Sequence, residues 1–340
     1  MLKVGINGFG RIGRLAARII LSKYKNKLDL AVINTSGSVP AASWVHLFKY
    51  DTAYGKYGGE VFCEGENLVV DGKRISLLAQ RDPALIPWGN YGVEVVVEST
   101  GVFREKKEVE KHLRDSVRRV VLSAPGKGEE EIKTIVIGVN DSERADEKII
   151  SSASCTTNCV APATKVILEN FGIKKALLTT IHAYTPDQEL QDGSHKDLRR
   201  ARAAASNIVP TTTGAAKATA KTLPALAGKF DGTAIRVPVL VGSLSDITYV
   251  VERQTTVKQI NEAFKKATEG KLRGILEVTS EPLVSSDIIG KEASAIVDLT
   301  LTKVIAGDLV KLVAWYDNEW GYANRLVEEV LATTTEQNKL

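Results

Sequence analysis

Residues 6–14 read INGFGRIGR, and this stretch decides the expected fold of the first part of the chain. Its glycines follow the pattern G-x-G-x-x-G, between an apolar strand at residues 2–7 and an amphipathic helix. In this context Gly8 allows a tight turn, Gly10 lets the backbone approach a pyrophosphate, and Gly13 lets helix and strand pack closely. The stretch therefore predicts a dinucleotide-binding turn, with the pyrophosphate at the positive end of the helix dipole.

The residues around this turn alternate between strand and helix patterns. Apolar runs at residues 28–34, 93–100 and 118–126 are typical of buried strands, and residues 104–115 are charged and helix-prone. Such alternation indicates a mostly parallel sheet covered by helices. We therefore expect an α/β chain that opens with a Rossmann-type domain.

A second motif carries reactive groups. Residues 151–160 read SSASCTTNCV and place Cys155 at the start of a predicted helix. A thiol at a helix N-terminus has a depressed pKa, and the thiolate is the nucleophilic form. His182 ends the next apolar strand, 27 residues after Cys155, and is the candidate base beside this nucleophile. The remaining histidines and cysteines are interpreted as structural: His46, His112, His195, Cys63 and Cys159.

The pattern changes after about residue 154, where long β-rich runs follow one another with fewer helices between them. These runs predict an α+β catalytic domain whose sheet is largely antiparallel. The last segment is amphipathic, so we expect a helix that returns to the first domain. The predicted division is a dinucleotide-binding domain at 1–154, completed by a C-terminal helix at 320–340, and a catalytic domain at 155–319.

The composition bounds the class of protein. The chain has 340 residues, 44% of them hydrophobic and 25% charged, which is ordinary for a soluble two-domain protein. A net charge of +4 is too small to indicate nucleic-acid binding by itself, although it suits anionic substrates. Three sparse cysteines, no signal-peptide pattern and no apolar run of membrane-helix length lead us to expect a cytoplasmic protein that needs no membrane.

A series of specific motifs follows in order from about residue 2 to residue 335: INGFGRIGR, LFKYDT, ESTGVF, SAPGKG, SCTTNC, HAYTPDQ, HKDLRRARAA, PTTTGAAKA, AIRVPV and WYDNEWGYANR. Together they resemble the phosphorylating glyceraldehyde-3-phosphate dehydrogenases of the NADP-using type. Two small departures are Val160, where leucine is usual, and Pro186, where asparagine is common.

The resemblance implies a reversible reaction on a small-molecule substrate. Cys155 attacks the aldehyde of D-glyceraldehyde 3-phosphate to form a thiohemiacetal, with His182 as base, and hydride transfer to NAD(P)+ leaves a thioester. Inorganic phosphate then attacks the thioester and gives 1,3-bisphosphoglycerate. Thr185 and Arg236 match the residues that hold the substrate's own phosphate. The residues that match those around the attacking phosphate are Ser154, Thr156, Arg200, Thr213 and Gly214.

The resemblance also implies a dinucleotide site, and no metal. Asn318 matches the residue that bonds the nicotinamide carboxamide, and Tyr322 would pack against that ring. The implied cofactor-binding residues are Gly8, Phe9, Gly10, Arg11, Ile12, Gly13, Asn34, Thr35, Ser36, Arg81, Ser123, Gly193, Ser194, Asn318 and Tyr322.

A missing acid bears on the identity of the cofactor. In NAD-specific members an aspartate usually follows Asn34, where it binds the ribose hydroxyl and repels a 2′-phosphate. Here Thr35 and Ser36 follow instead, and Gly193–Ser194 stand where NAD-specific members commonly have Leu-Pro. Arg81 adds positive charge, as its match does in NADP-using enzymes. We therefore predict an NADP preference, or dual use of NADP and NAD, which favours the reductive direction of gluconeogenesis or carbon fixation over glycolysis.

Two alternative functions are compatible with the same motifs. The first alternative is an erythrose-4-phosphate dehydrogenase, a related enzyme that uses the same cysteine and histidine on a different aldehyde. A binding protein that keeps the fold without catalysis is a further alternative, because the basic segment at 195–204 is, in isolation, a solvated helix face or an RNA-binding patch. The resemblance implies a homotetramer with no required nucleic acid. The cofactor ratio and the physiological direction are left open by the sequence.

Overall fold

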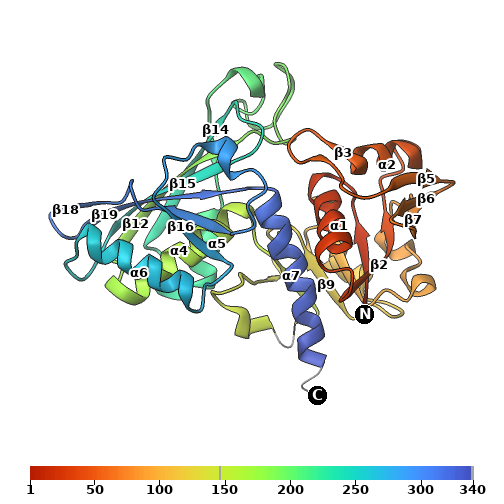
Figure 1. Cartoon of the computed structure of the whole chain (residues 1–340), viewed down its shortest axis with the longest axis horizontal. Coiled ribbons are helices and arrows are strands. Elements are labelled where there is room, and N and C mark those ends of the chain that lie inside the picture. The colour runs from red at the N-terminus through yellow and green to blue at the C-terminus, as the bar shows by residue number, and fades with distance from the viewer. Residues whose placement is uncertain (145–146, 338–340) are drawn as a thin grey trace. The chain divides into compact units, whose positions relative to one another are not determined.

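Two units make up the chain in the computed structural model, which describes residues 1–144 and 147–337 (Figure 1). The first unit contains Met1–Ile135, Ser142–Ala153 and the described residues from Ala323 onward. The second unit contains Val136–Asp141 and Ser154–Tyr322. The predicted domain boundaries, at residue 154 and before residue 320, stay a proposal about how the chain divides.

The first unit is built on a nine-stranded sheet within the described residues. In sheet order its strands are β10 (Lys133–Thr134), β11 (Ile149–Ser151), β9 (Arg119–Leu122), β8 (Val95–Glu98), β1 (Leu2–Asn7), β2 (Leu28–Asn34), β7 (Lys73–Leu78), β6 (Asn67–Val70) and β5 (Val61–Glu64). Neighbours from β10 through β7 are parallel, and β6 and β5 continue antiparallel at one edge. Strands β8 and β9 read VVVE and RVVL and are buried along their whole length, which is typical of a parallel sheet covered on both faces.

Helix α1 (Arg11–Lys23) forms over the segment predicted after the glycine-rich turn. It packs against β1 and β2 through one apolar face, with Leu15, Ile19 and Ile20 buried (Figure 1). The other short elements of this unit are α2 (Ala41–Lys49), β3 (Tyr50–Asp51), β4 (Gly55–Lys56), η1 (Pro83–Leu85) and η2 (Trp88–Tyr91). Two elements are shared with the second unit: η4 (Asp141–Arg144) contributes its residues from Ser142 onward, and α7 (Trp320–Gln337) those from Ala323 onward.

The helix-prone segment at 104–115 forms less helix than its composition suggests. It is divided into α3 (Lys106–Val109) and η3 (Glu110–His112). Val109 and His112 are the buried side chains of these two turns, so little apolar burial supports a longer helix.

The turn between β1 and α1 depends on its glycines. Gly8 has a φ angle of 96°, a left-handed conformation that residues with a side chain rarely adopt. A Cβ atom at Gly13 would lie 2.0 Å from the carbonyl oxygen of Gly8, so only glycine allows the helix and the turn to approach so closely. A Cβ atom at Gly10 would meet nothing within 4 Å, which leaves that side of the turn open.

The second unit contains a mixed sheet. In sheet order its strands are β13 (Val209–Thr212), β14 (Phe230–Val237), β12 (Lys175–Ala183), β15 (Ser243–Val250), β19 (Leu309–Tyr316), β17 (Ala295–Asp298) and β16 (Leu276–Thr279), and β18 (Lys303–Ile305) pairs with β19. Among these described strands, the pairs β12–β14 and β16–β17 are parallel and the others antiparallel. The predicted fold class, a Rossmann-type parallel sheet followed by an α+β unit with a largely antiparallel sheet, is confirmed.

Three helices cover one face of this second sheet (Figure 1): α4 (Cys155–Phe171), α5 (Ala215–Thr222) and α6 (Val257–Glu269). The same core contains the alternate residues Val310, Leu312, Ala314 and Tyr316 of β19, which all point toward the helices. The unit also contains the short turns η5 (Ala204–Ser206), η6 (Pro224–Leu226) and η7 (Ser285–Ile288).

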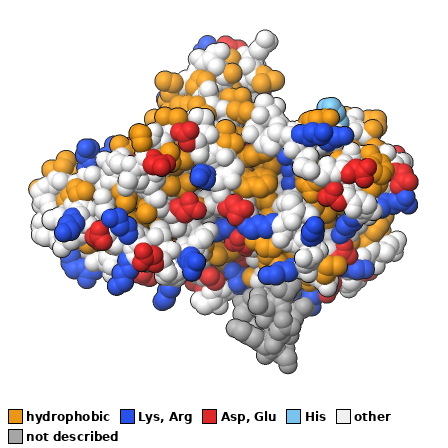
Figure 2. All heavy atoms as spheres, in the orientation of Figure 1, with side chains coloured by type: hydrophobic (Ala, Val, Ile, Leu, Met, Phe, Trp, Pro, Cys, Tyr) orange, Lys and Arg blue, Asp and Glu red, His pale blue; other side chains and the backbone are white. Residues whose placement is uncertain are grey.

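Figure 2 shows acidic and basic side chains interspersed over one face of the molecule, without a large region of a single sign on the described part of that face. This agrees with the net charge of +4 and adds no support for a nucleic-acid surface. Of the helices described, none has the length and apolar character that crossing a membrane requires.

We predict that Gly13→Ala destabilises the protein whereas Gly10→Ala does not. The methyl group at position 13 must displace the Gly8 carbonyl, and overpacking of this kind costs about 1–3 kcal/mol. The methyl group at position 10 points into open space. Urea-induced unfolding of both variants beside the wild type measures the difference, and equal stability of the two variants would contradict the close packing of turn and helix.

Candidate active site

Cys155 is the first residue of α4, and His182 lies near the end of β12. The Ser154 hydroxyl caps α4 by accepting a hydrogen bond from the N–H of Thr157 at 3.1 Å. The Cys155 Sγ atom lies 3.4 Å from Nε2 of His182. The two side chains are therefore in contact, as the sequence predicts, although they are 27 residues apart along the chain.

The orientation of the His182 ring is fixed from its other side. Nδ1 lies 2.7 Å from the carbonyl oxygen of Ala183, which only accepts hydrogen bonds, so the ring proton of the neutral imidazole is on Nδ1. The Tyr316 ring meets His182 edge-on at a centroid distance of 6.0 Å. The lone pair of Nε2 therefore faces the thiol of Cys155, and this arrangement can accept its proton.

Burial decides the protonation of this pair. It raises the pKa of the Cys155 thiol, and the charge of Arg236 and hydrogen bonds involving Thr156 offset this only in part. Burial, followed by the charge of Arg236, lowers the pKa of His182 to about 3. The sequence-based expectation of a depressed thiol pKa is therefore wrong for the free chain, because desolvation outweighs the helix terminus. The pair is a neutral thiol beside a neutral imidazole.

The strand register brings Arg236 to the same place. β12 and β14 pair in parallel with His182 opposite Arg236, so both side chains leave the same face of the sheet. The Arg236 Nη1 donates to the Thr185 hydroxyl at 2.8 Å, and Nε is buried without a partner among the described residues. A cation with an unused donor beside Cys155 and His182 suits an anionic group. The predicted pair of Thr185 and Arg236 is thus brought together.

Arg200 has a different environment. Its guanidinium donates to the Thr211 hydroxyl at 2.9 Å and to the Asp187 carboxylate, and Asp197 lies 3.4 Å away. Two carboxylates therefore already surround this predicted anion ligand. Asp197 is three residues before Arg200, whereas Asp187 is 13 residues away, so the ion pair with Asp187 could not be expected from the local pattern.

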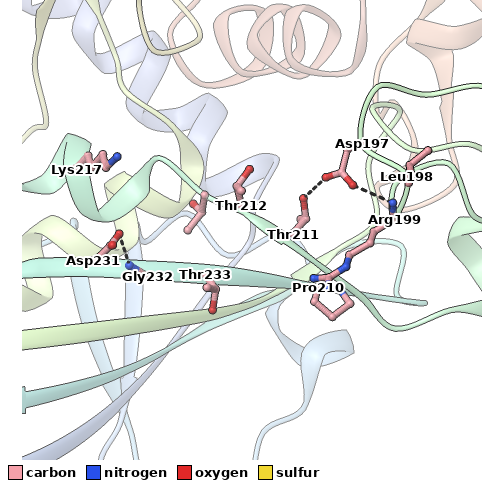
Figure 3. A pocket seen from close by; sticks show the side chains of 11 residues that line it. Asp197, Leu198, Arg199, Pro210, Thr211, Thr212, Lys217, Asp231, Gly232 and Thr233 are labelled. Atoms are coloured by element: carbon pink, nitrogen blue, oxygen red, sulfur yellow. Dashed lines mark hydrogen bonds between the residues drawn. The ribbon is translucent and has the colours of Figure 1, made fainter.

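Thr213 and Gly214 lie at the start of α5, where the Thr213 hydroxyl accepts a hydrogen bond from Ala215. Thr213 also lines a pocket of about 650 Å³, in which Thr211 donates to the Asp197 carboxylate (Figure 3). Thr156 is buried on α4, and its hydroxyl lies 2.9 Å from that of Tyr316. The residues expected around the attacking phosphate therefore fall into separate local clusters: Ser154 and Thr156 on α4, Arg200 with Asp187, and Thr213 and Gly214 before α5.

Asn318 is held at the start of β15. Its Oδ1 accepts hydrogen bonds from the N–H of Gly242 at 3.1 Å and the hydroxyl of Ser243 at 2.9 Å, so its Nδ2 remains as a donor. The Ser243 hydroxyl in turn accepts from the N–H of Ala183, beside His182. Tyr322 is buried, whereas Gly193–Ser194 are exposed in the loop after β12.

A pocket of about 360 Å³ opens in the first unit, where β1, β2 and β8 end. Ligands bind at the carboxyl ends of parallel strands in such sheets. Seven predicted cofactor residues line it: Gly8, Phe9, Gly10, Asn34, Thr35, Ser36 and Arg81. The prediction missed the other lining residues, Asn7, Trp44, Gln80, Ser99, Thr100, Val102 and Phe103. Four of these residues directly follow β8, which pairs with β1. In the sequence, the apolar run at 93–100 was the available signal for them.

Four further predicted residues of this unit do not line the pocket: Arg11, Ile12, Gly13 and Ser123. The Arg11 guanidinium forms an ion pair with Asp51 at 2.8 Å, so its side chain has a partner within the unit. Gly13 acts through packing, as described above. Ser123 follows β9, and its N–H donates to the carbonyl of Glu98.

The part of the pocket that follows β2 has hydroxyls and a cation where the sequence comparison with NAD-specific members leads us to expect an acid. The Thr35 hydroxyl donates to the carbonyl of Leu78 at 2.9 Å, and the Ser36 and Ser38 hydroxyls lie 2.7 Å apart. Arg81 is exposed and forms no ion pair with any residue that the structure describes. None of the described lining residues is acidic. The pocket is therefore open to a group with negative charge.

The pocket fits a dinucleotide. No side chain caps the start of α1, and the first N–H groups of a helix have no partner within it. The Trp44 Nε1 is a buried donor without a partner among the described residues, and Trp44 lines the same pocket. An open glycine face, helix N–H groups and an unused indole donor match the phosphates and polar rings of such a ligand.

A Rossmann-type unit with a dinucleotide pocket, followed by an α+β unit with a thiol–imidazole pair, is the arrangement of an NAD(P)-dependent oxidoreductase. Residues 2–106 match the family description "Glyceraldehyde 3-phosphate dehydrogenase, NAD binding domain", and residues 154–318 match the corresponding C-terminal domain. The chain therefore belongs to the glyceraldehyde-3-phosphate dehydrogenase family and is an enzyme of the phosphorylating type.

Curated relatives are similar along nearly the whole chain. Glyceraldehyde-3-phosphate dehydrogenase 2 of Streptomyces avermitilis is 52% identical over 96% of this chain and 97% of its own length. The enzyme of Thermotoga maritima is 52% identical over 96% of this chain and 98% of its own length. A chloroplastic enzyme of Arabidopsis thaliana is 49% identical over 96% of this chain and 82% of its own length.

We predict that acid destabilises the wild type more than a His182→Asn variant. The pKa of histidine is about 6.5 in an unfolded chain and falls to about 3 at His182, so the unfolded state binds the proton more tightly. The contribution of His182 to the free energy of unfolding is fully present above pH 6.5 and is lost as the pH falls toward 3. Between pH 7.5 and pH 5 this one residue lowers the free energy of unfolding by about 2 kcal/mol.

Urea unfolding of both proteins at pH 7.5 and pH 5, at equal protein concentration, measures this difference. His46→Asn, on the outer face of α2, controls for the loss of one histidine. An equal loss of stability in wild type and His182→Asn would show that His182 is protonated in the folded state.

Proposed function

We propose that Cys155 is the nucleophile and His182 the base of the phosphorylating dehydrogenase reaction. The observation that carries the proposal is the 3.4 Å contact between Sγ and the unprotonated Nε2, with Nδ1 bonded to Ala183. His182 takes the thiol proton as sulfur bonds to the aldehyde carbon, and it returns that proton to the new alkoxide. Because the imidazole is neutral, with its proton on Nδ1, Nε2 is unprotonated and can accept this proton.

An NAD(P)+ held in the dinucleotide pocket would supply the hydride acceptor, and His182 would take the proton of the thiohemiacetal hydroxyl as that carbon is oxidised. An oxygen of inorganic phosphate then bonds to the thioester carbon, the carbon–sulfur bond breaks, and Cys155 leaves as a thiolate that is reprotonated from His182. The buried charge of Arg236, which favours the thiolate, stabilises this leaving group.

The anion-binding roles follow from the local clusters. Arg236 and Thr185, joined at 2.8 Å, are proposed to hold the phosphate of the substrate. The attacking phosphate is assigned to Ser154, Thr156, Arg200, Thr213 and Gly214. For Arg200 this assignment requires phosphate to compete with the Asp187 carboxylate, because the two anions need the same guanidinium.

We predict that Cys155→Ser and His182→Asn each lower kcat by at least about a thousandfold, since each removes one half of the proton-transferring pair. Cys159→Ser is the matched control. Burial raises the pKa of Cys159 to about 12, and its thiol faces the carbonyl of Ala314. Steady-state assays with glyceraldehyde 3-phosphate, phosphate and either cofactor measure the effect. Full activity of Cys155→Ser would refute the assignment, and erythrose 4-phosphate assayed in parallel tests the sister activity.

We also propose that NADP is the preferred cofactor and that NAD is still accepted. The proposal is supported by Arg81, which pairs with no acid among the described residues, and by Thr35 and Ser36 in a pocket whose described lining contains no acid. Gly193–Ser194 are exposed in the basic loop, where a small residue and a hydroxyl are compatible with the same preference. An NADP preference would favour the reductive direction of the reaction.

We predict a kcat/KM at least about tenfold higher for NADP than for NAD, which corresponds to about 1.4 kcal/mol. Thr35→Asp should reverse the ratio by repelling the 2′-phosphate, and Arg81→Ala should lower only the NADP value. Lys27→Ala, remote from the pocket lining, is the control for loss of a surface cation. Equal effects of Arg81→Ala on both cofactors would refute a 2′-phosphate role.

A homotetramer in the cytoplasm is the proposed state of the protein. Self-association is supported by large apolar side chains exposed in one segment of the second unit, Leu190, Leu198 and Ile208. A reducing compartment is supported by three cysteines that are all free thiols. No nucleic acid or membrane partner is invoked.

A further inference from the structure

A buried polar network lies next to the dinucleotide pocket, and the proposed reaction does not use it. Its centre is Glu98, the last residue of β8, and His112 in η3. Both side chains are completely buried, at 0% exposure. Burying a carboxylate is costly unless hydrogen bonds compensate for the lost water, so its partners are informative.

Four donors converge on the Glu98 carboxylate. Oε1 accepts hydrogen bonds from the N–H of Thr100 at 2.8 Å and from the Thr100 hydroxyl at 2.5 Å. Oε2 accepts from Nδ2 of Asn7 at 2.5 Å and lies 3.1 Å from Nε2 of His112. An ionised carboxylate only accepts hydrogen bonds, so each of these contacts fixes the direction of its donor.

The tautomer of His112 completes this set. The Trp88 Nε1, which only donates, lies 3.1 Å from Nδ1 of His112. In the neutral imidazole Nδ1 is therefore the acceptor and Nε2 carries the proton, which it donates to Glu98. Trp88 and His112, which are not among the residues that line the pocket, thus hold the carboxylate in place.

The network continues into the pocket through two amides. Because Nδ2 of Asn7 donates to Glu98, its Oδ1 is turned to accept from Nδ2 of Asn34 at 2.7 Å. The same Nδ2 of Asn34 donates to the carbonyl of Gln80 at 2.8 Å, and Oδ1 of Asn34 accepts from the N–H of Gln80 at 2.9 Å. Asn7, Asn34, Gln80 and Thr100 all line the pocket.

We propose that Glu98 is a positioning residue for the dinucleotide: it sets the amide orientations of Asn7 and Asn34 and the position of Thr100, and His112 with Trp88 fixes Glu98. A carboxylate is needed because all of its neighbours are donors. An amide at position 98 would place an N–H₂ donor against the donors of either Thr100 or Asn7. The amides of Asn7 and Asn34 would then have to turn over to restore their hydrogen bonds. This inference rests on the proposed assignment of the pocket to the cofactor.

The test is Glu98→Gln, which preserves shape and removes the second acceptor. We expect the KM for NADP and for NAD to rise about tenfold, while the KM values for glyceraldehyde 3-phosphate and phosphate and the kcat at saturating cofactor stay within about twofold. The matched control is Glu329→Gln, since Glu329 is also completely buried and pairs with Arg144 at 2.7 Å, away from the pocket lining. It should lose stability and keep its cofactor KM.

A second pair of variants keeps the test decisive if Glu98→Gln does not fold. His112→Gln retains a donor toward Glu98 and should keep a cofactor KM within about threefold of wild type, whereas His112→Leu removes the donor and should raise it about tenfold. Equal cofactor KM values for these two variants, or parallel changes in every kinetic constant of Glu98→Gln, would overturn the inference.

Gly10→Ala separates this inference from the assignment of the pocket. Its methyl group occupies the open side of the turn, so a bound pyrophosphate should be hindered and the cofactor KM should rise. If Gly10→Ala leaves that KM unchanged, the pocket assignment fails. If Gly10→Ala raises it and Glu98→Gln does not, only the positioning role of Glu98 fails.

Discussion

The register of β12 between β14 and β15 is the constraint on which the chemistry of the second unit depends. Parallel pairing places His182 opposite Arg236, and antiparallel pairing brings the Ser243 hydroxyl to the N–H of Ala183. A slip of one residue would turn His182 to the opposite face of the sheet. The core under this sheet specifies the register, because alternate residues of its strands are buried against α4, α5 and α6.

In the two buried histidines, His112 and His182, neighbouring groups determine which ring nitrogen carries the proton. His182 carries it on Nδ1, since that atom faces the Ala183 carbonyl, and its Nε2 is left to accept. His112 carries it on Nε2, since Nδ1 accepts from Trp88. The same side chain therefore presents an acceptor to Cys155 in one unit and a donor to Glu98 in the other. The difference arises from a single hydrogen bond on the far nitrogen of each ring.

Much of the fold and part of the site could be predicted from the sequence, while the errors share one cause. The position of Cys155 at a helix N-terminus predicts a lowered pKa, whereas burial, which SSASCTTNCV does not reveal, raises it. The prediction that Arg200 binds an anion did not include its ion pair with Asp187. The helix-prone segment at 104–115 forms only short turns, since few of its side chains are buried. In each case the local pattern is present in the sequence, but the burial and the distant partners that decide the outcome are not.

The sequence by itself determined the glycine-rich turn, the strand and helix pattern, the motifs that define the family and the candidates Cys155 and His182. These depend on backbone conformation and on residues close together in the chain. Only the tertiary structure decided the 3.4 Å thiol–imidazole contact, the protonation of that pair and the network around Glu98. Burial and hydrogen-bond partners come from distant segments, as in the bond between Asn7 and Glu98, which are 91 residues apart, so no local reading of the chain contains them.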